Sequence, residues 1–146
     1  MKGLVFLFCM LWLGASARQD APVKQGISGK IYLQKGDQMP VPGRKPGKGA
    51  AVSRTVLVYQ LTTLKQVGGV TNFYNTIQTQ MVAKTQSNDK GEYAIALPEG
   101  SYSVFVQESG LLYANDFDGE GHICPVTVVA DKVSKKDVVV SHGGVD

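Results

Sequence analysis

Acidic residues between positions 108 and 125 are the part of this chain whose types and spacing could do chemistry. The candidate oxygen ligands of this stretch are the side chains of Asn115, Asp116, Asp118 and Glu120. Carboxylates separated by glycine are the hard ligands that Ca²⁺ uses, although the full twelve-residue calcium pattern with its terminal glutamate is absent. Two hypotheses stay open: a weak calcium site formed by Asp116, Asp118 and Glu120, or a turn held by local side-chain hydrogen bonds.

Four aromatic residues form a second group of candidate binding residues. They are Phe73, Tyr74, Tyr113 and Phe117, and all lie in stretches without clear strand periodicity. Exposed rings could stack on a sugar or on the surface of a partner protein. The alternative is that these rings fold back and cap the core, because aromatic side chains contribute strongly to core packing.

Residues suited to catalysis are scarce. The chain has two histidines, His122 in the acidic stretch and His142 near the end, and no serine or cysteine stands in a nucleophile-elbow context. The sequence therefore predicts a protein without enzymatic activity and without a cofactor other than the calcium considered above.

The first seventeen residues have the pattern of a secretory signal peptide. Lys2 precedes an apolar run at 4–13, and the small residues Ala15, Ser16 and Ala17 follow it. This run is shorter than the roughly 20 residues that span a bilayer. We expect cleavage after Ala17, no transmembrane segment afterwards, and export to the periplasm, the cell envelope or the extracellular space.

Cysteine content and charge exclude several classes of protein. After cleavage Cys124 is the one remaining cysteine, so no intrachain disulfide can form, and we expect a buried thiol. The formal net charge of the whole chain is +3, and its basic residues are spread rather than gathered with aromatic residues. This composition argues against nucleic-acid binding, which requires a basic face able to displace counterions.

Short alternating segments predict an all-β domain over residues 26–141, after a disordered leader at 18–25 and before a tail at 142–146. We expect seven strands, at 26–33, 54–61, 77–86, 92–97, 101–107, 126–130 and 135–141. Long connections separate them at 34–53, at 62–76, where a helical turn fits, and at 108–125. Apolar residues on both faces of 54–61 indicate a central strand. Gly91 and Gly100 mark tight reversals.

One part of this pattern resembles a known family. The hairpin at 88–102, with its Asn88, Asp89 and Gly91 turn, and the segment Gly26-Ile27-Ser28-Gly29-Lys30-Ile31 are similar to the carboxypeptidase regulatory-like domain. The resemblance implies a transthyretin-like, seven-stranded antiparallel Greek-key β-sandwich that acts as a non-catalytic module. The hydroxyisourate hydrolases of the same group end in Tyr-Arg-Gly-Ser, and this chain lacks that ending.

Three functions follow as hypotheses. The first is an exported module that binds a protein partner or supports a cell-envelope assembly through its long loops. The second is a carbohydrate-binding module. The third, a small hydrolase, is disfavoured because the residues for it are few.

Overall fold

The computed structural model describes residues 23–34, 42–43, 47 and 49–141, and within these ranges it is an all-β protein. The expected signal peptide, most of the leader, the tail and much of the 34–53 connection lie outside the described ranges. The described strands are β1 (Gly26–Gln34), β2 (Ala50–Ala51), β3 (Thr55–Gln60), β4 (Val67–Val70), β5 (Phe73–Ile77), β6 (Met81–Gln86), β7 (Glu92–Ala96), β8 (Gly100–Glu108), β9 (Leu111–Tyr113), β10 (Pro125–Val128), β11 (Val133–Lys135) and β12 (Val138–Ser141). No helix in these ranges is long and apolar enough to cross a membrane.

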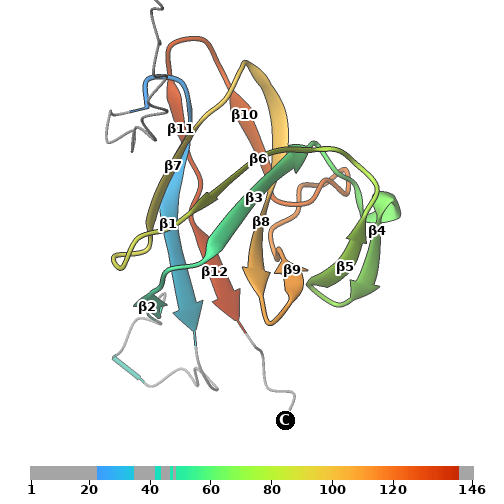
Figure 1. Cartoon of the computed structure of the whole chain (residues 1–146). Helices are drawn as coiled ribbons and strands as arrows, with labels where there is room; N and C mark the ends of the chain where they lie inside the picture. Colours follow the sequence, from blue (N-terminus) through green and yellow to red (C-terminus); the bar gives the residue numbers. More distant parts are fainter. Residues whose placement is uncertain (1–22, 35–41, 44–46, 48, 142–146) are drawn as a thin grey trace, which may run out of the picture.

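The strands form two packed sheets (Figure 1). In the smaller sheet β1 is central, with β7 and β2 antiparallel on one side and β11 and β12 parallel on the other. The larger sheet has the order β4-β5-β9-β8-β3-β6, and β10 also pairs with β8. The expectation of an all-β protein with antiparallel sheets is confirmed, although twelve strands are described instead of seven and two pairings of β1 are parallel. The last predicted strand, at 135–141, corresponds to β12, and the additional strand β11 ends where the predicted strand begins.

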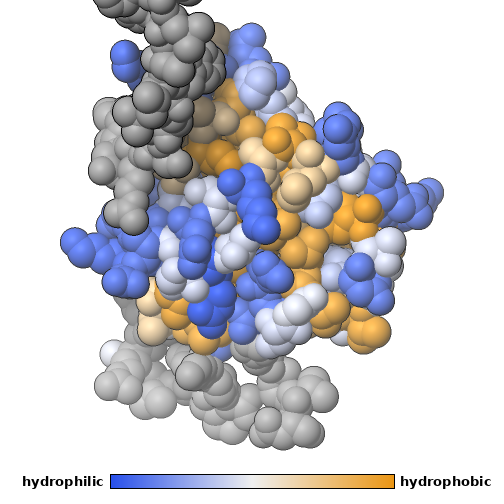
Figure 2. All heavy atoms as spheres, in the orientation of Figure 1, coloured by the Kyte–Doolittle hydropathy of each residue, from blue (hydrophilic) through white to orange (hydrophobic). Residues whose placement is uncertain are grey.

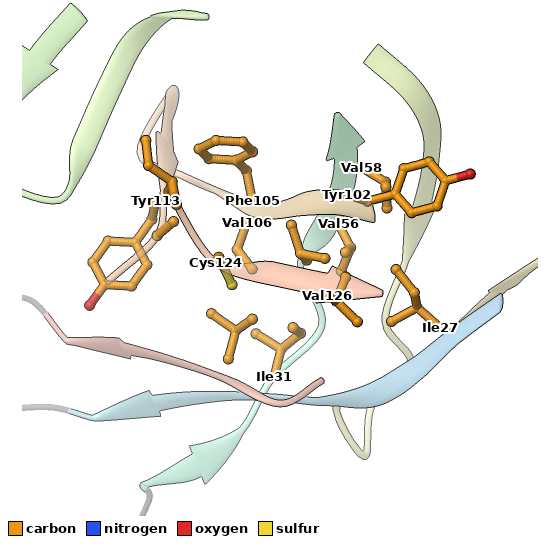
Figure 3. Close-up of a cluster of buried hydrophobic side chains, with 14 of the residues drawn as sticks. Ile27, Ile31, Val56, Val58, Tyr102, Phe105, Val106, Tyr113, Cys124 and Val126 are labelled. Atoms are coloured by element: carbon orange, nitrogen blue, oxygen red, sulfur yellow. The ribbon is translucent and has the colours of Figure 1, made fainter. Parts of the chain in front are cut away.

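The core lies between the two sheets. Val56 and Val58 of β3 stand opposite Val106 and Val104 of β8, and all four are fully buried. Figure 3 shows Val56, Val58 and Val106 on the side of the larger sheet that faces Ile27 and Ile31 of β1, and Val104 belongs to the same buried cluster. The expectation of a central strand at β3 is confirmed, because β3 pairs with β6 on one side and β8 on the other.

The opposite face of the larger sheet carries a second group of packed rings. Figure 3 shows Phe105 pointing away from Ile27 and Ile31, although its ring is also fully buried. Tyr59 and Tyr74 approach Phe105 edge to face, with ring centroids 5.4 and 6.0 Å away. The path of β4, β5 and β9 in the larger sheet explains how this outer face is covered.

One long ribbon covers that face. The antiparallel pair β3–β6 leads, through a short 3₁₀ turn at Leu64–Gln66, into the pair β4–β5. β5 then pairs with β9, which returns to β8 in the middle of the same sheet. The connection at 62–76 is therefore a turn followed by most of a hairpin, and only its helical turn was expected. The strand predicted from position 77 begins at Met81, because Ile77 belongs to β5.

The turn predictions at the two glycines are confirmed. Gly91 has a φ of +75°, and a Cβ atom there would lie 2.6 Å from the carbonyl oxygen of Ile31. Gly100 has a φ of +154°, which is also uncommon for residues with a side chain. Asn88 completes the first turn, since its Oδ1 accepts the N–H groups of Lys90 and Glu92.

Candidate functional site

The predicted loops at 62–76 and 108–125 pack together into one unit. We call this unit the insertion lobe and define it as residues 62–80 and 108–125. The N–H of Leu64 donates to the carbonyl of Gly121, and the N–H of Ile123 donates to that of Thr62. At the other end of the lobe, β5 pairs with β9. Hydrogen bonds of this kind satisfy the backbone, so the acidic stretch is held in place by the rest of the lobe.

Asp118 organises the acidic stretch. Its Oδ1 accepts the backbone N–H groups of Glu120 and His122, both at 2.9 Å, and its Oδ2 lies 2.6 Å from Nδ1 of the His122 ring. A single carboxylate thus closes a turn and orients an imidazole. The hypothesis of a turn held by local side-chain hydrogen bonds describes what the structure shows here.

Electrostatics in this turn favour the ionised form of Asp118. Desolvation acts to raise the pKa of its carboxyl. Hydrogen bonds from the backbone and ring of His122 and from the N–H of Glu120, together with the charge of the imidazole, outweigh this and hold the pKa below its usual value. Oε2 of Glu120 lies 3.8 Å from the same ring nitrogen.

These three side chains could share a cation. One ligand atom each from Asp118, Glu120 and His122 falls within a 4.8 Å spread. The predicted calcium set included Asp116 instead of His122, but Oδ2 of Asp116 accepts a hydrogen bond from Nζ of Lys136. His122 was not in the set of ligands predicted from the sequence, although it lies in the same acidic stretch. The Asp118, Glu120, His122 spacing, with every second residue polar in a glycine-rich turn, is the signal that would have shown it.

Two of the four predicted aromatic binding residues are buried. Tyr113 is 1 % exposed and Tyr74 is 4 % exposed, so both belong to the core, as the alternative hypothesis held. Phe73 lies against Tyr113 with ring centroids 5.1 Å apart, and the Tyr113 hydroxyl accepts the N–H of Ser141. Phe117 is 39 % exposed and is the one of the four that presents much surface.

Cys124 lies beneath the lobe and is buried, as predicted. Its φ of +41° is unusual for a residue with a side chain. Burial raises the pKa of its thiol to about 11; Asp116 adds to the rise, and Lys136 opposes it. The backbone N–H of Cys124 donates a hydrogen bond to the backbone carbonyl of Asp116. This hydrogen bond connects the acidic stretch to the buried Cys124.

Comparison with protein-family models, with curated proteins and with solved structures finds no match to this chain. The resemblance to the carboxypeptidase regulatory-like domain therefore stays a prediction from the sequence.

Proposed function

We propose that this chain is an exported, non-catalytic β-sandwich module of the carboxypeptidase regulatory-like type that binds a protein partner through its insertion lobe. The observation that supports the proposal is that large apolar side chains of the lobe are exposed to solvent. Four residues of the lobe do so: Leu64 at 51 %, Val70 at 79 %, Leu111 at 36 % and Phe117 at 39 % exposure. Contiguous apolar patches on a structured surface are a common mark of protein contact, and we infer that these four side chains contribute to one.

The lobe also has the rigidity that a binding surface needs. Its two segments are joined by backbone hydrogen bonds on one side and by the β5–β9 pairing on the other. Figure 2 shows apolar surface extending to the side of the molecule where Figure 1 draws β4 and β5. A surface held in this way loses little conformational entropy when a partner binds.

A photoreactive amino acid placed at position 70 tests the proposal in cells that make the protein. We expect a discrete adduct with one partner, lost when Leu64 and Phe117 are both changed to serine. The matched control places the same group at position 129, because Val129 is 44 % exposed outside the lobe. Adducts of equal strength from both positions, or none from position 70, would contradict the proposal.

The hydrolase alternative has one observation in its favour. A carboxylate that orients an imidazole, as Asp118 orients His122, forms part of many hydrolytic sites. Screening the purified protein against ester and amide substrates, with His122→Ala as the control, addresses it. A hydrolytic activity that disappears in the variant would overturn the non-catalytic proposal.

A further inference from the structure

A polar hollow lies away from the insertion lobe, beside the β1 and β7 strands of the smaller sheet. Its volume is about 620 Å³, within the range of small-molecule sites. Strand register explains the hollow. Ser28 of β1 stands beside Ala94 of β7, and Gly29 follows, so three small residues adjoin one another. Longer side chains surround them.

The residues around this hollow are charged or polar. Ser28 is also the register partner of Lys135 on β11, while Lys30 stands opposite Glu92 on β7. All three charged residues are exposed. Side chains from the end of β6 and from the β6–β7 turn complete the lining: Thr85, Gln86 and Asn88. The rim thus offers two ammonium groups, one carboxylate, hydroxyls and side-chain amides.

This chemistry suits one class of ligand. Hydroxyls and amides both donate and accept, as the many hydroxyl groups of a sugar require. Lys30 and Glu92 are register partners on neighbouring strands, so among the three charged residues that line the hollow Lys135 is the excess positive charge. We propose that the hollow binds an acidic oligosaccharide, with Lys135 contacting a sugar carboxylate and the polar rim contacting hydroxyls.

The surroundings of the hollow are well fixed. The hydroxyl of Tyr93 donates to the carbonyl of Lys136, and the N–H of Lys30 donates to Oδ1 of Asp137, so β7, β1 and the β11–β12 segment are tied together. Tyr93 is itself buried and presents no ring face for stacking. Recognition therefore rests on hydrogen bonds and charge. Figure 1 draws these strands on the side of the molecule opposite β4 and β5, so this proposal stands apart from the partner surface.

Titration calorimetry with trigalacturonic acid, with a neutral galactose trimer for comparison, tests the proposal on the mature chain. We expect saturable binding of the acidic trimer and at least tenfold weaker binding of the neutral one. Lys135→Glu should weaken binding of the acidic trimer at least tenfold. Lys65→Glu, which makes the same charge change at an exposed position in the lobe, should leave it unchanged.

A second variant probes the space rather than the charge. Ala94→Trp fills the hollow from an exposed position and should abolish binding with the melting temperature retained. The proposal is overturned if the acidic trimer fails to bind at 10 mM, if Lys65→Glu weakens binding as much as Lys135→Glu, or if inorganic phosphate competes at equal concentration. Loss of photo-adducts at position 70 would leave these measurements unaffected, so the two proposals fail separately.

Discussion

Nε of Arg54 donates a hydrogen bond to Oε2 of Glu108 at 2.6 Å, joining the segment before β3 to the last residue of β8. The carboxylate is almost entirely buried, and Arg54 also donates to the carbonyl of Ser53. Charge-assisted bonds of this kind are stronger than neutral ones. This contact fixes the point where the chain passes from the smaller sheet into the larger one.

Removing the guanidinium should therefore destabilise the fold. We expect Arg54→Ala to cost roughly 2–3 kcal/mol, the range for losing a hydrogen bond to a buried charged group, and Arg54→Lys to cost less. Urea unfolding of the mature chain measures both. Lys84→Ala, at an exposed position of β6, is the control and should change little. Equal effects from Arg54→Ala and Lys84→Ala would show that the ion pair is weak.

Two glycines with nearly the same backbone angle separate backbone strain from steric clash. Gly91 and Gly110 have φ values of +75° and +78°, but only Gly91 has backbone within contact distance of an added Cβ. Gly110→Ala should cost about 1 kcal/mol from its φ alone. Gly91→Ala should cost roughly 1–3 kcal/mol more, because the carbonyl of Ile31 must move. Identical melting temperatures for the two variants would contradict this.

Calcium should stabilise the folded chain if the acidic turn binds it. A ligand that binds only the folded state adds about 2.7 kcal/mol at a hundredfold excess over its dissociation constant. Thermal melts with millimolar calcium and with a chelator make the comparison. Glu120→Gln should abolish any calcium effect at little structural cost, since this side chain is 83 % exposed. Asp89→Asn serves as control, and superimposable curves for the parent protein would remove the metal hypothesis.

Acid should weaken the turn around Asp118. The folded-state pKa of this carboxyl is depressed, so its contribution is present above the unfolded value, near 3.9, and is lost as the pH falls through the lower folded value. The parent chain should therefore exceed Asp118→Asn in stability at pH 6, and the two should converge only when the pH falls below the depressed folded-state pKa. Carboxyl chemical shifts of Asp118 across this range give the pKa directly. A value above 4 would refute the argument.

Cys124 should be inert to thiol reagents in the native protein. With a pKa of about 11, only about one thiol in a thousand is ionised at pH 8, and the thiol is also buried. We expect the mature chain to react with a disulfide reagent at least a hundredfold faster in guanidinium chloride than in buffer. Rapid native labelling would mean that the loop above Cys124 opens easily.

Local signals predicted the local parts of the fold. Alternation through Tyr93, Ile95 and Leu97 gave β7, and the turn at Gly91 followed from side-chain and φ preferences. Pairing between distant segments has no local signal, which is why the parallel contacts of β1 with β11 and β12 were missed. Residues 67–70, Val-Gly-Gly-Val, form a strand only because β5 pairs with them.

In the candidate site too, contacts between residues close in sequence could be predicted and contacts between distant residues could not. Proximity in sequence was enough to place Asp118 and Glu120 together with His122. Asp116 does not join them, because its carboxylate accepts a hydrogen bond from Lys136, which lies 20 residues further along the chain. Tyr113 looked like a loop residue, since β9 is three residues long, and it is buried because β5 and β8 flank it on both sides.

The central place of β1 sets the order in which the chain can fold during synthesis. Lys30 and its hydrogen-bond partner Asp137 lie 107 residues apart, so the smaller sheet cannot be completed until Asp137 has left the ribosome. The β3–β6 and β4–β5 hairpins have no such delay, and β7 can pair with β1 earlier than β11 and β12 can. A nascent chain would thus carry a formed ribbon beside a first strand whose β11 and β12 edge is still unpaired, and that edge would stay open to holding factors until those two strands emerge.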